Sequence, residues 1–178
     1  MPKRPKRVEG DQRHRADKRH RADAAQFFVA AELCRRGLVA VVTLGNCPNT
    51  DILVSDANAS GFCHIQVKTF RPNDRTVSVG QKAEQNPGER FFWVLAGIPE
   101  PNAKSQEYVF YILPASEMAK GVKAVHKLWS ETPGKKGQRR NAETSMRTIN
   151  LPPREEITGW SLLPYKNRWD LITAAVGV

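Results

Sequence analysis

Three residues on two neighbouring segments have the types and spacing that hydrolysis of a phosphodiester needs. Asp51 opens the segment 51–54, and Gln66 and Lys68 follow fifteen and seventeen positions later. Residues two apart on a β-strand point to the same face, so Gln66 and Lys68 can converge with Asp51 across a hairpin. This hydrolysis uses an oxygen ligand that holds Mg²⁺ and a cation beside the charge that develops on phosphorus. Asp51 is therefore the candidate metal ligand, and Lys68 is the candidate stabilising cation.

Histidine and cysteine residues offer a second kind of site. Cys47, Cys63 and His64 together could hold a zinc ion. The chain has no C-x-x-C pair, however, and Cys34 lies far from the others, so buried structural thiols are the favoured interpretation of the cysteines. His64 shares a predicted strand face with the candidate cation and could contact substrate, although a lone histidine is more often a structural group.

The surrounding sequence predicts the elements that position these residues. Residues 24–37 are typical of a helix, with Asp23 as its N-cap and Gly37 as its stop. Alternation over residues 62–70 predicts a strand with one apolar and one polar face. Other apolar runs predict strands at 38–44, 51–55, 75–79, 91–96 and 108–113, and a helix from about Ser116. This mixture predicts an α/β fold with a mixed central β-sheet flanked by α-helices.

The helix ending in Arg-Arg-Gly, the next strand, Asp-Ile-Leu-Val and Ile-Gln-Val-Lys-Thr occur here in that order. They resemble the PD-(D/E)XK nuclease superfamily, in its resolvase-like and Mrr-like branch with a D…QxK motif. The resemblance runs from about Asp23 to Thr69. Segments around Trp129, Met146 and Arg168 are similar to uncharacterised bacterial members.

The resemblance implies a restriction-endonuclease-like fold and a metal-dependent endonuclease that hydrolyses DNA with Mg²⁺ or Mn²⁺. It implies that Asp51 and Gln66 hold the metal, with the Val67 carbonyl completing the shell, and that Lys68 is catalytic. Gln66 stands where the family has its second acid. An amide keeps an acceptor oxygen but lacks the charge that attracts a divalent ion.

The family also contributes an acidic residue from the first helix. The corresponding position here is nearest Gln26, which we therefore include among the catalytic candidates. Asp23 and Glu32 are the possible acidic assistants on this helix. For Asp23 the alternative role is the N-cap, and for Glu32 it is a solvated partner of Arg35 or Arg36.

Two amides in place of acids leave an alternative function open. The chain could be a catalytically impaired nuclease-fold protein that binds DNA, or an interaction subunit of a defence or repair assembly. In the second case, the Phe28 side of the first helix and the terminal tryptophans would meet the partner.

Positive charge is concentrated at the start of the chain. The 178 residues have a net charge of +10, and residues 1–22 hold nine Lys or Arg and three acidic residues. Residues 1–22 are predicted to be a basic, disordered arm, serving either as a phosphate contact or as a solvated tail. Residues 23–178 are predicted to form a single nuclease-like domain with a C-terminal extension, about 126–178, whose tryptophans pack against the core.

Further cations are candidate nucleic-acid contacts. They are Lys82, after the fourth predicted strand, and a group in a glycine-containing loop: Lys135, Lys136, Arg139 and Arg140. The alternative is that they are ordinary solvated charges.

The composition also bears on partners and location. No apolar run of about 18 residues is present, and the first residues lack the apolar centre of a secretory signal. We therefore expect a cytoplasmic protein with no membrane partner. Strong positive charge predicts a nucleic-acid partner, which the resemblance makes DNA. The two strands of a duplex favour a homodimer.

Overall fold

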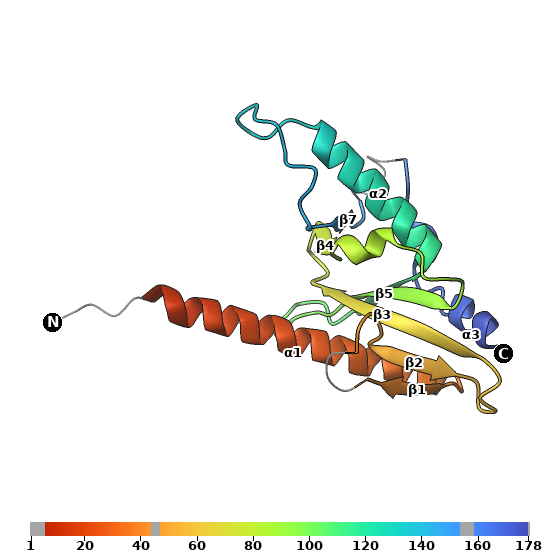
Figure 1. The fold of residues 1–178 in the computed structure, drawn as a ribbon. Helices are drawn as coiled ribbons and strands as arrows, with labels where there is room; N and C mark the ends of the chain where they lie inside the picture. The colour runs from red at the N-terminus through yellow and green to blue at the C-terminus, as the bar shows by residue number, and fades with distance from the viewer. Residues whose placement is uncertain (1–5, 44–46, 154–158, 178) are drawn as a thin grey trace.

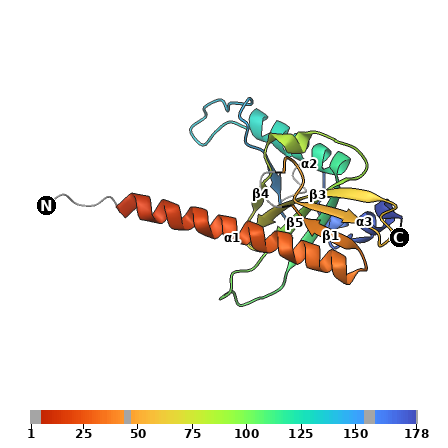
Figure 2. The same cartoon turned by 60° about the horizontal axis from the view of Figure 1, so that its bottom comes forward.

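The computed structural model describes residues 6–43, 47–153 and 159–177, with side chains described from Lys18 onward. Two layers of helices enclose a central sheet (Figure 1). Helix α1 (Lys6–Arg35) lies along one face of the sheet, and α2 (Ala115–Glu131) lies on the other. The N-terminal half of α1 extends beyond the sheet in both views (Figures 1 and 2). No helix in these ranges is long and apolar enough to cross a membrane.

The central sheet has the strand order β1-β2-β3-β5-β6. All neighbours are antiparallel except β3 and β5, which run parallel, so the predicted mixed sheet and α/β class are confirmed. The bounds of the strands are Val39–Val42 for β1, Ile52–Ser55 for β2, Phe62–Phe70 for β3, Phe91–Gly97 for β5 and Val109–Pro114 for β6.

Helix α1 ends as predicted and begins earlier than predicted. At its end, the Gly37 N–H donates to the Cys34 carbonyl and the Leu38 N–H to the Leu33 carbonyl, with Gly37 at φ +83°. This is a Schellman motif, in which glycine adopts the left-handed conformation without strain.

The predicted helix start at Asp23 is wrong, because α1 begins at Lys6. No proline follows Pro5 in this stretch, and Arg, Lys and Ala, which favour helix, dominate the next 17 residues. Residues 6–22, predicted to be a disordered arm, are therefore helical. Residues 1–5 of that arm lie outside the described residues.

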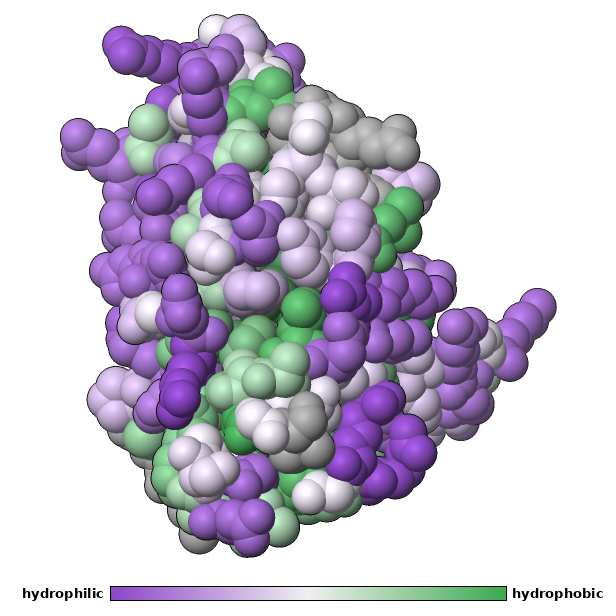
Figure 3. All heavy atoms as spheres, turned by 90° about the vertical axis from the view of Figure 1, so that its right-hand side faces the viewer, coloured by the Kyte–Doolittle hydropathy of each residue, from purple (hydrophilic) through white to green (hydrophobic). Residues whose placement is uncertain are grey.

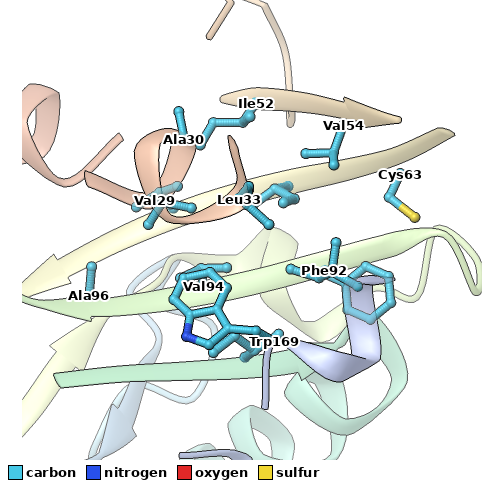
Figure 4. Packing of buried hydrophobic residues seen from close by; sticks show 14 of the residues in the cluster. Val29, Ala30, Leu33, Ile52, Val54, Cys63, Phe92, Val94, Ala96 and Trp169 are labelled. Atoms are coloured by element: carbon cyan, nitrogen blue, oxygen red, sulfur yellow. The ribbon is translucent and has the colours of Figure 1, made fainter. Parts of the chain in front are cut away.

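The faces of β3 alternate as its sequence predicts. Cys63, Ile65 and Val67 are buried in a cluster with one side of α1. Figure 4 shows the packing of this cluster, with Val29 and Leu33 of α1 against the sheet. Gln66 and Lys68, on the opposite face, stay partly exposed.

A smaller second layer covers the other face of the sheet. It contains α2, the 3-10 helix η1 (Gln81–Glu84) and a two-stranded sheet of β4 (Thr76–Ser78) and β7 (Thr148–Asn150). The strand predicted at 75–79 exists, but it pairs with β7 instead of joining the main sheet. Only three residues form β7, too few for an alternation pattern in the sequence to reveal it.

The C-terminal extension returns to the domain as predicted. The 3-10 helix η3 (Leu163–Tyr165) and helix α3 (Asp170–Val176) end it, and Trp169 is buried with its ring 5.3 Å from that of Phe110. Trp160 stacks on Tyr165. These tryptophans are structural anchors. Residues 154–158 of the extension lie outside the described residues.

The prediction of buried thiols holds for one cysteine. Cys63 is buried, whereas Cys34 and Cys47 are exposed. Cys34 directly follows the buried Leu33 and so lies about 100° around the helix from it, on the solvent side. Cys47 lies in the connection between β1 and β2.

The surface mixes polar and apolar areas. On the face drawn in Figure 3, hydrophilic side chains flank a smaller central area of hydrophobic ones. The large exposed apolar residues of the molecule include Val39 and Val41 of β1 and Phe62 of β3. They lie on the face of the sheet opposite α1, since α2 contacts β5 and β6 and leaves β1 and β2 uncovered.

Candidate functional site

The centre of the site is the Asp51 carboxylate, held at the open edge of β3. Asp51 directly precedes β2, and its backbone N–H donates to the Ile65 carbonyl at 2.8 Å. Because β2 begins only at Ile52, the next inward-facing N–H of β3, that of Val67, has no strand partner on this edge. It donates instead to Oδ2 of Asp51 at 2.7 Å. The side-chain amide of Gln66 donates to the same oxygen.

The pKa of the Asp51 carboxyl lies above its ordinary value. Burial raises this pKa, and it outweighs three opposing effects: the Val67 N–H, the positive charge of Lys68 and the Gln66 amide. The carboxylate is thus poorly compensated by the protein alone. An approaching cation would favour its ionised form.

Asp51 opens into a groove of about 530 Å³ between α1 and the end of β3, which we call the β3 groove. Its functional side chains come from α1, the residue before β2, β3 and the turn that follows β3. They are Lys18, Arg21, Gln26, Asp51, Gln66, Lys68, Thr69, Arg71 and Asp74. Four of these are cations and two, Asp51 and Asp74, are carboxylates, so the groove carries a net positive charge.

Lys68 is the groove cation whose positive charge acts on the Asp51 carboxylate. It lies on the same face of β3 as Gln66 and lines the groove together with Asp51. Its ammonium makes no hydrogen bond or ion pair with any described residue. The charge is therefore available to an anion in the groove.

Helix α1 contributes an amide and not an acid. Gln26 lines the groove, as predicted from its place on the inner stripe of the helix. Asp23 is exposed and is not part of the groove lining. Glu32 binds Arg35 and Arg36 at 2.8 Å, and the hydrogen bond from Arg35 is the main cause of its lowered pKa. Both acidic candidates of the helix thus lie away from Asp51.

Three groove cations were not among the sequence-based candidates. Lys18 and Arg21 line the groove from α1, and Arg71 lines it from the residue after β3. Lys18, Ala22 and Gln26 follow one another at intervals of four residues, and Arg21 lies three after Lys18, so they share one helix face, which becomes evident only once α1 is known to begin at Lys6. The error in the helix start therefore concealed Lys18 and Arg21 as individual site residues, whereas Arg71 lies outside α1.

Glu100 restrains two of these cations. Its Oε1 accepts from Nη2 of Arg21 at 2.8 Å and from Nε of Arg71 at 2.7 Å. Glu100 follows β5, so this single oxygen connects α1, the end of β3 and the end of β5. It also neutralises part of the groove's charge when no anion is bound.

The predicted nucleic-acid contacts fall in two other places. Lys82 of η1 donates to Oδ1 of Asn49 at 2.9 Å, close to Lys68 in a second, smaller pocket. The loop cations follow the C-terminal end of α2, where Arg140 stacks over Trp129 at 4.9 Å. The β3 groove includes none of the loop cations, Lys135, Lys136, Arg139 and Arg140.

His64 has a structural partner. Its Nδ1 lies 3.1 Å from the hydroxyl of the buried Thr50. His64 does not line the groove, which agrees with a structural role and not with substrate contact. In the described ranges, no group of three or more His, Cys, Asp or Glu side chains gathers in a metal-binding arrangement.

The donor set of the groove fits a hard cation that retains water. It consists of the Asp51 carboxylate, the amide oxygens of Gln66 and Gln26, and the Val67 carbonyl, which alternation places on the same strand edge as the Val67 N–H. Mg²⁺ binds through one or two carboxylates and keeps several waters, whereas zinc prefers His and Cys ligands. In addition, the Thr69 hydroxyl in the groove wall is buried and makes no hydrogen bond with the described part of the chain.

Comparisons with known proteins give structural resemblances only. No family model and no curated protein matches the chain. The chain is similar to a bacterial homing endonuclease, I-Ssp6803I, with 18% identity over 88% of this chain and 92% of that one and a TM-score of 0.49. It is also similar to Hjc of Archaeoglobus fulgidus, a Holliday junction resolvase from an archaeal hyperthermophile, with 14% identity over 79% of this chain and 97% of that one and a TM-score of 0.41. Similarity at this level assigns neither a family nor an activity.

Proposed function

We propose that this protein is an endonuclease of the PD-(D/E)XK kind, with a restriction-endonuclease-like fold, that hydrolyses phosphodiester bonds in DNA. The observation that carries the proposal is the opening of the Asp51 carboxylate and the unpaired Lys68 ammonium into one basic groove. The order of helix, strand, acidic motif and lysine motif supports this choice. The preference for DNA over RNA follows from the same resemblance.

In this proposal each part of the groove has a role in binding or catalysis. Lys18, Arg21 and Arg71 bind backbone phosphates on either side of the reacting one. Lys68 stabilises the negative charge that develops on the phosphoryl oxygens as water attacks. The Gln66 amide, next to Asp51, orients the attacking water or lends its oxygen to the cation.

Mg²⁺ or Mn²⁺ is the proposed cofactor, held by Asp51, the Val67 carbonyl and Gln66. When bound, such an ion lowers the pKa of a coordinated water and neutralises charge on the phosphate. Asp51 must be ionised to hold it, so binding of the ion and loss of the Asp51 proton are coupled.

One observation favours a second candidate function. Gln66 donates its amide to Asp51 where a second carboxylate would strengthen a cation site, and Gln26 is also neutral. A protein of this kind could bind DNA through the groove without cutting it. Binding that is unaffected by EDTA, without cleavage, is the signature of this alternative.

Cleavage assays separate the two functions. Wild type, Asp51→Ala and Lys68→Ala are incubated with supercoiled, linear and single-stranded DNA in Mg²⁺, Mn²⁺ or EDTA at one salt concentration. Lys123→Ala, an exposed site on α2, is the matched control for the loss of a lysine. We expect metal-dependent cutting by wild type and Lys123→Ala alone. Equal DNA binding by all four proteins with no cutting in any metal would support the binding function instead.

The homodimer remains a prediction. Sedimentation of the protein alone and with duplex DNA measures the number of chains per complex. Two chains per duplex would agree with the prediction, and a single chain would contradict it.

A further inference from the structure

A second pocket lies on the other side of Lys68 from the β3 groove. It has a volume of about 160 Å³ and lies between the sheet and η1. We call it the Trp93 pocket, and its defining residues are Asn49, Gln81, Gln85, Phe91 and Trp93. Lys68 lines both the pocket and the groove, so the two spaces are neighbours.

Phe91 and Trp93 form the aromatic wall of the pocket. Trp93 is only 4% exposed, and its Nε1 has no hydrogen-bond partner in the described structure. A buried indole N–H normally has an acceptor, because leaving it unpaired costs free energy. Phe91 lies beside it, with ring centroids 5.9 Å apart. The two largely buried rings therefore give the pocket a flat, apolar wall.

The remaining lining is rich in amides and carries two cations, Lys68 and Lys82. Asn49, Gln81 and Gln85 each offer both a donor and an acceptor, and no carboxylate lines the pocket. Lys82 connects Asn49 to η1 by its 2.9 Å hydrogen bond and so joins the two sides of the pocket. Amides beside aromatic rings are the groups that recognise the edges and faces of nucleobases.

The shared Lys68 relates the pocket to the proposed chemistry. A nucleotide whose phosphate lies at Lys68 in the groove has its own base within reach of the neighbouring pocket. A base that is paired and stacked in a duplex cannot enter so small a space. The base that enters must therefore be unpaired, or must leave the helix.

We propose that the Trp93 pocket binds one unpaired or extruded nucleobase of the nucleotide whose phosphate lies at Lys68. The protein then prefers DNA that contains an unpaired nucleotide over fully paired duplex. This inference rests on the proposed nuclease function, since it takes the phosphate at Lys68 as its reference point.

Binding in EDTA tests the inference without cleavage. Three labelled duplexes of equal length are compared: one fully paired, one with a single unpaired central nucleotide, and one with an abasic residue at that unpaired position. We expect wild type to bind the unpaired nucleotide at least about tenfold more tightly than paired duplex, the scale of one base stacked on an aromatic ring. The abasic duplex should lose this advantage, because it keeps the backbone distortion and lacks the base.

Variants of the pocket assign the preference to it. Gln81→Ala and Gln85→Ala change exposed side chains, and Trp93→Phe removes the indole N–H while keeping a buried ring. Each should reduce the tenfold preference and leave affinity for paired duplex unchanged. Asn58→Ala is the matched control. This exposed amide lies in the turn between β2 and β3, which precedes the first residue of β3, whereas Lys68 lies near the last. Thermal unfolding confirms that Trp93→Phe is folded.

The failures of the two proposals can be told apart. Equal affinity for all three duplexes, in a wild type that cuts DNA in an Asp51-dependent way, overturns the pocket and leaves the nuclease in place. A preference for the unpaired base that Gln81→Ala and Gln85→Ala abolish, in a protein that cuts nothing, supports the pocket and overturns hydrolysis. A preference that the abasic duplex retains also overturns the pocket, because the protein then recognises the bent backbone.

Discussion

The backbone N–H of Val67 lies 2.7 Å from the Asp51 carboxylate, sixteen positions earlier in the chain. This contact exists because β2 stops short of Val67, so a strand edge that would otherwise pair with backbone binds a side chain instead. The same edge presents the Val67 carbonyl. The end of one short strand therefore creates both the anchor for the carboxylate and its neighbouring oxygen donor.

The raised pKa of Asp51 predicts that its ionised form, which a metal ion needs, makes the fold less stable. A group whose pKa is higher in the folded state stabilises the fold fully below its unfolded pKa, and this stabilisation is lost as the pH rises through the folded pKa. Ionised Asp51 therefore contributes less to stability at pH 8 than protonated Asp51 does at pH 4. Asp51→Asn keeps an acceptor for the Val67 N–H without the charge. It should melt at a higher temperature than wild type at pH 8, with the difference shrinking toward pH 4.

Thermal unfolding of both proteins between pH 4 and pH 8 checks this prediction. A variant that is less stable than wild type at pH 8 would mean that the Asp51 charge stabilises the fold, against the burial argument.

Glu100 predicts a variant that binds DNA more tightly. Glu100→Gln removes the carboxylate that holds both Arg21 and Arg71 and so leaves two groove cations free for phosphates. Exposed ion pairs contribute about 0.2–1 kcal/mol each, so releasing two should strengthen binding about two- to thirtyfold at low salt. The measurement is the dissociation constant for duplex DNA in EDTA, with salt varied.

The control for Glu100→Gln is Glu107→Gln, an equal change of charge at an exposed position of the same β5–β6 connection. If both variants strengthen binding equally, overall charge and not the release of the two arginines is responsible.

Gln66→Glu tests the cation site by a readout other than activity. Without metal, the new carboxylate repels Asp51 and loses the amide hydrogen bond, at a cost of about 1–3 kcal/mol. The melting temperature should fall by several degrees in EDTA. Mg²⁺ should then raise it by more than it does in wild type, because two carboxylates bind the ion more tightly.

Gln85→Glu adds the same charge outside the groove and should show no Mg²⁺ response beyond that of wild type. A Gln66→Glu protein that Mg²⁺ fails to stabilise would argue against a cation site at Asp51.

Arg147 supports the layer that forms the wall of the Trp93 pocket. It is 5% exposed, donates to Glu84 of η1 at 2.5 Å, and also binds the carbonyls of Thr144 and Met146. Arg147→Leu leaves the Glu84 carboxylate without its partner. Since Glu84 is 21% exposed and water can solvate it in part, we expect a loss of about 2 kcal/mol of unfolding free energy.

Urea unfolding measures this loss, with Arg139→Leu, at an exposed loop position, as the control. Equal midpoints for Arg147→Leu and wild type would contradict the structural role of the ion pair.

Strong local patterns in the sequence predicted much of the fold. The alternation of β3 indicated its bounds and both of its faces. Gly37 marked the end of α1 because glycine adopts the left-handed backbone conformation of a helix end without strain. The start of α1 was missed because the sequence of its first half has no apolar stripe. Strand β7 was missed because its pairing with β4 depends on a contact about 70 residues away.

The candidate site likewise contains some residues that the sequence predicts and others that only the folded structure reveals. Asp51, Gln66, Lys68 and Gln26 lie on or beside segments whose helix or strand character the sequence reveals, and the structure brings all four to one groove. Arg71 and Glu100 could not be predicted, because they meet only where the ends of β3 and β5 lie side by side. Asp23 and Glu32 differ from Gln26 by their angle around α1, which their spacing indicates only approximately.

The most direct test of the central claim is a double-mutant cycle on the single-turnover rate of DNA cleavage in Mg²⁺. Asp51→Asn, Lys68→Ala and the double variant are compared with wild type at saturating protein. If Asp51 and Lys68 act on one phosphate, each single change lowers the rate at least about 100-fold, and the double change lowers it little further. Cleavage at the wild-type rate by either single variant would contradict the claim.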